Sequence, residues 1–143
     1  MDFVSTRNQD NKASFSQAIT NCLCSDGGLY IPSTNEDLRP WVYYLKNTTS
    51  FSSIAGSLTS ALLKEEFSPI ISEAIATNAF LFAPDFTQLD DNLYKLSLFT
   101  GPTGSHKDFG VSYLVNCLEY TLLLQDKKAV VFAISDGEIG SSL

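Results

Sequence analysis

The first half of the chain carries its apolar residues mostly at helical spacing. Ser14 precedes one such segment, and Gln17 is three positions after Ser14. This is the pattern of a capping box at a helix start. Residues 50–66 repeat apolar side chains at intervals of three and four. Ser68 and the proline after it then mark the start of another helix. Residues 1–82 are therefore predicted to form a small, mainly helical unit.

Strand-like patterns appear in the second half of the chain. Residues 92–99 alternate apolar and polar side chains, as in a half-buried strand. The apolar face of that strand would hold Tyr94, Leu96 and Leu98. Residues 107–125 return to helical spacing, and residues 128–134 form a continuous apolar run typical of a buried parallel strand. Strand, helix and strand in this order predict a right-handed β-α-β unit.

The predicted fold class is α/β, and the predicted sheet is incomplete. A mainly helical unit over residues 1–82 precedes the beginning of a parallel β-α-β domain over residues 83–143. Two parallel strands by themselves leave unpaired edges and bare apolar faces. We therefore expect this sequence to be the front part of a longer protein, whose further strands complete the sheet.

Charge and composition narrow the functional classes. The chain has 143 residues, of which 44% are hydrophobic and 17% are charged, and such a chain can bury a core. A formal net charge of −7 without a basic stripe argues against nucleic acid as a partner. No apolar run reaches the roughly 20 residues that cross a bilayer, and no secretory leader is visible. We expect no membrane partner and a cytoplasmic location.

The cysteines do not suggest a disulfide framework, because their number is odd. Cys22 and Cys24 form a C-x-C pair that could bind a metal, but no further cysteine or histidine cluster completes a site. Small buried thiols are the favoured interpretation of these residues and of Cys117. No metal is predicted.

The glycine-rich stretch LFTGPTGSHKDFG is the strongest candidate for chemistry. Ser105 and Asp108 fit a Ser-x-x-Asp helix start, with Ser105 capping the helix and Asp108 reaching back. Lys107 then falls in the first helical turn, where a cation costs about 0.3–1 kcal/mol against the peptide dipole. A lysine amine can act as a nucleophile towards carbonyl groups, and Gly101 and Gly104 would let a ligand approach closely. On the residues alone, a solvated surface lysine is an equal alternative.

A second glycine-containing loop follows the strand predicted at residues 128–134. Its small residues are Ser135, Gly137, Gly140 and Ser141. Both loops would lie at the carboxyl ends of neighbouring parallel strands, the edge where open α/β sheets bind ligands. An ordinary strand-to-helix connection is the alternative, but two such loops around one lysine favour a ligand site.

Four segments of the chain resemble signatures of the threonine synthase family, which depends on pyridoxal phosphate and has fold type II. The lysine stretch resembles the cofactor-binding segment L-F-H-G-P-T-x-x-F-K-D-F. VSTRN resembles Y-x-S-T-R-G, and SDGGLYIP resembles P-D-G-G-L-Y-V-P. FAISDGEIGSSL is similar to A-T-S-G-D-T-G-S-A. These segments occur in the family's order, and the resemblance covers the whole chain.

The resemblance implies an enzyme that uses pyridoxal 5′-phosphate and converts O-phospho-L-homoserine and water to L-threonine and phosphate. Lys107 would be the catalytic residue, binding the cofactor covalently and carrying protons between substrate carbons. The implied cofactor-binding residues are Lys107, Phe109, Ser135, Gly137 and Gly140. The implied substrate-binding residues are Thr103, Ser105 and Arg7.

The chain also departs from these signatures. Thr100 and His106 stand where the family usually has His and Phe, and Glu138 and Ile139 stand where Asp and Thr are usual. The family's cofactor-phosphate loop would belong to the remainder of the chain, so the isolated fragment is expected to be inactive. An inactive threonine synthase-like remnant, acting as a binding or interaction module, is the alternative function. Another pyridoxal phosphate lyase of the same fold is less favoured, because SDGGLYIP and the helical unit are typical of threonine synthases.

Overall fold

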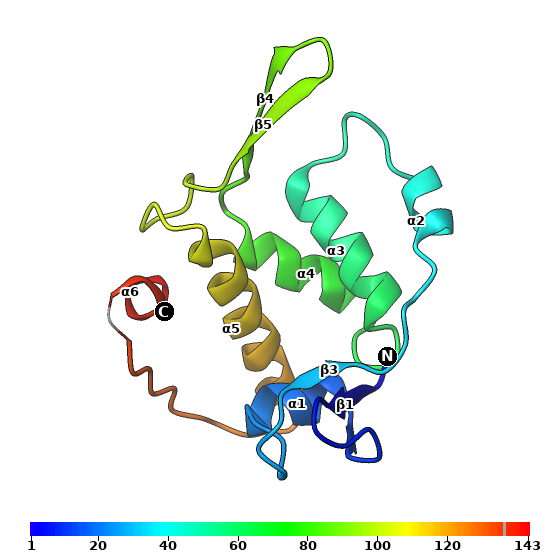
Figure 1. The fold of residues 1–143 in the computed structure, drawn as a ribbon, viewed down its shortest axis with the longest axis vertical. Coiled ribbons are helices and arrows are strands. Elements are labelled where there is room, and N and C mark those ends of the chain that lie inside the picture. Colours follow the sequence, from blue (N-terminus) through cyan, green and yellow to red (C-terminus); the bar gives the residue numbers. More distant parts are fainter. Residues whose placement is uncertain (136) are drawn as a thin grey trace. The chain divides into compact units, whose positions relative to one another are not determined.

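The computed structural model describes residues 1–135 and 137–143 and shows helices and two antiparallel sheets (Figure 1). In chain order the elements are β1 (Phe3–Ser5), β2 (Lys12–Ala13), α1 (Phe15–Asn21), β3 (Tyr30–Pro32), α2 (Arg39–Tyr43), α3 (Phe51–Leu62), α4 (Pro69–Ala79), β4 (Asp85–Asp90), β5 (Leu93–Ser97), α5 (Lys107–Leu124) and α6 (Glu138–Ser142). The chain divides into two compact units, residues 1–49 with 53–74, and residues 50–52 with 75–143. None of the described helices is long and apolar enough to cross a membrane.

The first unit contains a small antiparallel sheet with the strand order β2-β1-β3. Helix α1 follows β2 and begins as predicted, because Ser14 Oγ accepts from Gln17 N at 3.2 Å and Gln17 Oε1 accepts from Ser14 N at 2.9 Å. Phe15 packs edge-on against Phe67, a core side chain that is 2% exposed. The capping box fixes the start of the helix, and the aromatic contact ties it to the core of this unit.

Helices α3 and α4 confirm the two helices predicted from apolar spacing, and α4 begins at Pro69 as expected. Gly56 of α3 lies so close to α4 that a Cβ at this position would be 3.0 Å from Glu73 Cα. The short helix α2 is not predicted by the sequence pattern. Its Trp41 donates from Nε1 to Ser57 Oγ at 3.0 Å, so a contact with α3 supports it.

The second unit contains a hairpin of β4 and β5, paired antiparallel with an irregularity between Gln88 and Asp90. Strand β5 confirms the strand predicted at residues 92–99, whereas the sequence pattern predicts no strand at β4. The prediction of a half-buried face is wrong, because Tyr94 and Leu96 are 50% and 57% exposed. Pairing with one neighbour satisfies backbone hydrogen bonds along one edge but covers neither face of the strand.

The parallel β-α-β arrangement is not present among the described residues, whose sheets are both antiparallel. Residues 128–134, predicted as a buried strand, form no strand here, and Val130, Phe132 and Ile134 are 77%, 89% and 106% exposed. A strand forms only where a neighbouring strand pairs with its backbone, and β5 is paired with β4 instead.

Helix α5 confirms the helix predicted at residues 107–125 and carries the glycine-rich stretch at its start. An aromatic cluster holds this end of the helix. Phe109 packs edge-on against Phe51 and Phe82, with ring centroids 5.7 and 4.8 Å apart. One turn further on, Ser112 Oγ donates to the Ala79 carbonyl at 2.7 Å. The first two turns of α5 therefore have a fixed position within this unit.

All three cysteines are free thiols. Cys24 and Cys117 are buried, as interpreted from the sequence, but Cys22 is exposed, so that interpretation is wrong for Cys22. Burial raises the pKa of the Cys117 thiol to about 11, against a smaller opposing effect of a hydrogen bond with Tyr113. The described part of the chain has no cluster of three or more His, Cys, Asp or Glu side chains that could hold a metal.

Candidate functional site

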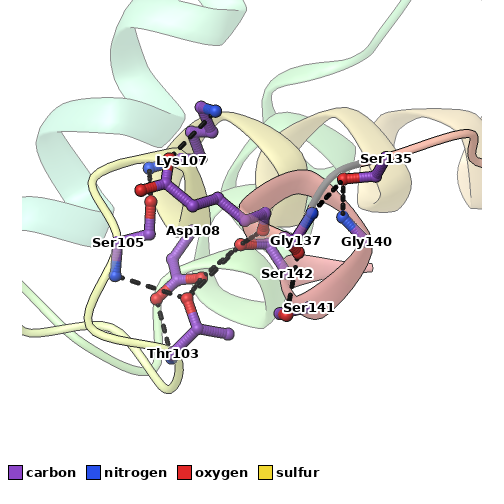
Figure 2. A network of polar contacts seen from close by, with 10 residues as sticks. Thr103, Ser105, Lys107, Asp108, Ser135, Gly137, Gly140, Ser141 and Ser142 are labelled. Atoms are coloured by element: carbon purple, nitrogen blue, oxygen red, sulfur yellow. Dashed lines mark hydrogen bonds and ion pairs between the residues drawn. The ribbon is translucent and has the colours of Figure 1, made fainter.

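Lys107 is the first residue of α5 and lies where the glycine-rich loop ends (Figure 2). Its backbone N–H donates to Ser105 Oγ at 3.2 Å, so the Ser105 hydroxyl satisfies one donor of the first turn. The N-cap position itself is His106, whose side chain makes no capping bond. The Lys107 side chain is 34% exposed, and its Nζ lies 2.9 Å from Glu138 Oε2. The lysine is thus partly accessible and paired with one carboxylate.

Asp108 is buried at the base of the same loop and joins it to α6. Its carboxylate accepts from Thr103 N at 2.9 Å, from Thr103 Oγ1 at 2.6 Å and from Ser142 Oγ at 2.6 Å (Figure 2). Asp108 therefore reaches back as predicted, but the donors at these distances are Thr103 and Ser142 rather than the predicted cap, Ser105. The two loops that the sequence analysis singled out are connected through this carboxylate.

The two glycines of the first loop have different roles in the structure. A Cβ at Gly101 would lie 2.6 Å from Asp108 Cβ, which is closer than side chains tolerate. At Gly104 an added Cβ would meet nothing within 4 Å, but the backbone has φ +71°, a conformation that favours glycine. Gly101 therefore makes room for Asp108, where the sequence suggested room for a ligand, and Gly104 permits the turn.

Hydrogen bonds keep two carboxylates of this region charged. Burial acts to raise the pKa of Asp108, but hydrogen bonds from Ser142 and Thr103 outweigh it and leave the pKa below its usual value. The pKa of Glu138 is also lowered, first by its hydrogen bond with Lys107 and then by the positive charge of that lysine. At neutral pH the region therefore holds two carboxylates, of which Glu138 pairs with Lys107.

The second loop is organised around the hydroxyl of Ser135. Its Oγ accepts from Gly137 N at 3.2 Å and from Gly140 N at 3.0 Å, and Ser141 Oγ donates to the Gly137 carbonyl at 2.9 Å (Figure 2). Gly137 has φ +144°, where a side chain would be strained. Residue 136 belongs to the predicted loop but lies outside the described residues. These hydrogen bonds connect Ser135 to the start of α6.

The two loops border one cavity of about 350 Å³. It is lined by Phe99, Thr103, Gly104, Ser105, His106, Gly137, Glu138 and Ser141. Three of the predicted site residues, Thr103, Ser105 and Gly137, are in this lining. Lys107 is not, but its partner Glu138 is. The structure therefore brings the predicted lysine and both loops to the same place.

Ser135, Gly140, Phe109 and Arg7 are also not in this cavity lining, and the last two are held by contacts elsewhere. Phe109 is two residues after Lys107, about 200° further round the helix, and its ring packs in the aromatic cluster with Phe51 and Phe82. Arg7 belongs to the other compact unit, where its Nη1 donates to the Asp26 carbonyl at 3.1 Å. The cofactor role of Phe109 and the substrate role of Arg7 stay predictions.

Sequence reasoning missed two residues of this region. Glu138 is the ion-pair partner of Lys107, and Ser142 donates to the buried Asp108. The one feature of the sequence that could have indicated this ion pair is the opposite charge of Lys107 and Glu138 in the two loops. They could not be paired from the sequence, because 31 positions separate them and only the tertiary fold brings them together.

Comparison with known proteins identifies the relatives of the chain. A family model described as "Threonine synthase N terminus" matches residues 2–85. Over 147 residues the chain is 29% identical to the threonine synthase of Pseudomonas aeruginosa, covering 99% of this chain and 31% of that protein. It is 30% identical over 156 residues to the threonine synthase of Corynebacterium glutamicum, covering 99% of this chain and 32% of that protein.

A solved structure agrees with these sequence matches. The structure titled "PLP bound Threonine synthase from Brucella melitensis" superimposes with a TM-score of 0.76 at 27% identity, over 88% of this chain and 28% of that one. The chain spans about a third of the length of the curated relatives that it matches. The family match extends over more than half of the chain. The resemblance of the four sequence segments is thereby confirmed, and the chain belongs to the threonine synthase family, of which it matches the N-terminal part.

Proposed function

We propose that the chain is the amino-terminal part of a threonine synthase, which converts O-phospho-L-homoserine and water to L-threonine and phosphate. The observation that carries this proposal is the position of Lys107, partly exposed at the start of α5 and bound to a residue that lines the cavity between the two loops. Residues 1–82 would be the helical unit of the enzyme. Residues 83–143 would begin its cofactor domain, in which 128–134 becomes a strand of a parallel sheet.

Pyridoxal 5′-phosphate is the proposed cofactor, and the residues around Lys107 fit it. A carbonyl cofactor requires an amine that it can reach, and Lys107 is 34% exposed. The carboxylate that pairs with this amine is 61% exposed and can turn towards solvent. When bound, pyridoxal phosphate supplies an electron sink that stabilises carbanions. The residues that would hold it are Lys107, Ser135, Gly137 and Gly140, with Phe109 fixing the first turn of α5.

The residues of the chain would divide the work as follows. Lys107 Nζ would take and return protons at the substrate carbons. Thr103 and Ser105, both in the cavity lining, would donate their hydroxyls to the substrate phosphate. Arg7 would add a charge-assisted contact to a substrate anion in the complete enzyme. Phosphate would leave the γ carbon and water would add at the β carbon, so that the atoms of substrate and water balance those of the products.

The isolated chain is proposed to be poorly active, because it spans only about a third of its relatives. The remainder of the enzyme would supply the other part of the cofactor site. The names of the relatives favour an enzyme over an interaction module, so no second function is proposed. A cytoplasmic location stays a prediction.

Cofactor attachment to the 143-residue chain tests the proposal. The chain is incubated with pyridoxal phosphate, reduced with borohydride and digested, and the modified lysine is located by mass spectrometry. We expect the label on Lys107 and loss of the visible cofactor absorbance in Lys107→Ala. Lys95→Ala, at an exposed position on β5, serves as the control and should keep the absorbance. Absorbance that persists in Lys107→Ala would reject the assignment of Lys107.

A further inference from the structure

Helices α5 and α6 meet through two polar pairs that are adjacent on α5. Asp108 Oδ1 accepts from Ser142 Oγ at 2.6 Å, and Lys107 Nζ lies 2.9 Å from Glu138 Oε2. Glu138 and Ser142 are four residues apart, so they share one face of α6. Ser142 Oγ also lies 3.0 Å from the Glu138 carbonyl, to which it donates. The bond between buried Asp108 and half-buried Ser142 therefore holds α6 in place, and this keeps Glu138 opposite Lys107.

The ion pair joins the Lys107 amine to a residue of the cavity lining. Glu138 lines the cavity and its carboxylate lies 2.9 Å from Lys107 Nζ, whereas Lys107 itself is not in the lining. A lysine attacks a carbonyl carbon only after its nitrogen has lost a proton. A carboxylate at hydrogen-bond distance engages the N–H groups of its partner, so the nitrogen has to leave it before bonding to carbon. The same carboxylate repels a ligand that carries negative charge.

We propose that Glu138 competes with anionic carbonyl compounds for Lys107, so that the carboxylate must turn away before such a compound reaches the amine. This inference rests on the proposed function, which takes Lys107 as the amine that meets the cofactor. Glu138 is a positioning residue in this scheme, since it acts through Lys107. The other titratable groups near the pair are His106 and Asp108, and Asp108 is already engaged by Thr103 and Ser142.

Both partners of the pair are partly exposed, and this sets the size of the effect. Solvent and salt screen an ion pair whose side chains are 34% and 61% exposed. Removing the carboxylate should therefore speed the reaction of Lys107 by about two- to fivefold, the range expected for an exposed pair. The increase should be larger for an anionic aldehyde than for a neutral one, because only the anionic one is repelled.

The test is reductive alkylation of the 143-residue chain by two small aldehydes of equal carbon number, anionic glyoxylate and neutral glycolaldehyde. The amine nitrogen bonds to the aldehyde carbon, the aldehyde oxygen leaves as water, and cyanoborohydride supplies the hydride that reduces the new C=N bond. Mass spectrometry of peptides gives the rate at each lysine. We expect Glu138→Gln to speed Lys107 labelling, more with glyoxylate than with glycolaldehyde, while the rate at exposed Lys127 does not change.

Glu119→Gln is the matched control, because it makes the same charge change at an exposed position of α5. It should leave the Lys107 rate unchanged. A second measurement needs no variant: added salt should speed glyoxylate labelling at Lys107 more than at Lys127 in the unaltered chain. An unchanged or slower Lys107 rate in folded Glu138→Gln, or no salt effect, would overturn the proposal. Neither aldehyde is the cofactor, so this result is independent of whether Lys107 binds pyridoxal phosphate.

Discussion

At the scale of single residues, Asp108 connects the two loops of the candidate site although it is not in the cavity lining. It is 1% exposed, yet it carries a negative charge that three hydrogen bonds from Thr103 and Ser142 stabilise. Loss of either partner would leave a buried charge with fewer donors. Because Lys107 is the preceding residue, the packing of Asp108 also fixes where the lysine side chain leaves the helix.

Gly101→Ala tests this packing. The added Cβ would collide with Asp108, so we expect the variant to be destabilised by about 1–3 kcal/mol, the usual cost of overpacking. Urea unfolding followed by circular dichroism measures the change. Gly110→Ala is the matched control, since its Cβ would meet nothing within 4 Å inside α5. It should stabilise the chain by about 1 kcal/mol through helix propensity. Equal effects of the two substitutions would contradict the proposed role of Gly101.

Asp108 also predicts a dependence of stability on pH. Its pKa is lowered in the folded chain, so the unfolded chain binds the proton more readily. The stabilisation by Asp108 is then fully present above its unfolded pKa of about 3.9 and is lost as the pH falls below that value. Urea midpoints are measured for wild type and Asp108→Asn from about pH 2.5 to about pH 7, a series that brackets that pKa. The midpoints of the two proteins should converge at low pH. A constant difference across this range would exclude titration of Asp108 as the cause.

The sequence singles out Lys107 because the whole signature around it lies within thirteen consecutive residues, and its role stays a prediction. It could not locate Glu138 as the partner, because that contact depends on how α6 folds back onto α5. Phe109 shows the opposite case. Its place in the motif suggests contact with the cofactor, but its position on the helix directs the ring into the aromatic cluster.

At the scale of elements, locally encoded features were predictable and pairing was not. The capping box of α1, the proline start of α4 and the apolar spacing of α3 and α5 lie within each helix, and the structure confirms all four helices. Strand β4, which was not predicted, and residues 128–134, which form no strand, show that local sequence does not determine strand pairing. Apolar, β-branched composition favours a strand, but whether one forms depends on a partner that lies elsewhere in sequence.

The short helix α6 should depend on one side chain for its position. Ser142→Ala removes the donor to Asp108, so we expect faster amide exchange across residues 138–142 and weaker pairing of Glu138 with Lys107. Ser141→Ala is the matched control, because its hydroxyl donates to the Gly137 carbonyl and the contact of Ser142 with α5 stays intact. Hydrogen exchange measured by NMR compares the two variants. Exchange that rises equally in both would mean that Asp108 does not anchor α6.

At the scale of the whole molecule, many large apolar side chains of the second unit are exposed. The hairpin exposes apolar side chains on both faces, and the residues after α5 form a second exposed apolar run. These side chains include Phe86, Leu89, Leu93, Tyr94, Leu96, Val130, Phe132 and Ile134. Such a surface is expected where further strands of a longer protein would pack, as the proposed function requires.

The exposed run at residues 128–134 should make the isolated chain self-associate, because it combines β-branched and aromatic residues with an unpaired backbone. We expect sedimentation velocity to show association that increases with concentration. Phe132→Lys should reduce this association, since it places a charge in the middle of the run. Tyr43→Lys, at an equally exposed aromatic residue of the first unit, should not reduce it.

If both substitutions reduce association equally, general surface charge rather than the unpaired run governs association. If the unaltered chain stays monomeric and neither substitution changes its sedimentation, residues 128–134 can remain exposed in a stable isolated chain. The expectation that further strands of a longer protein cover them then loses its main physical support.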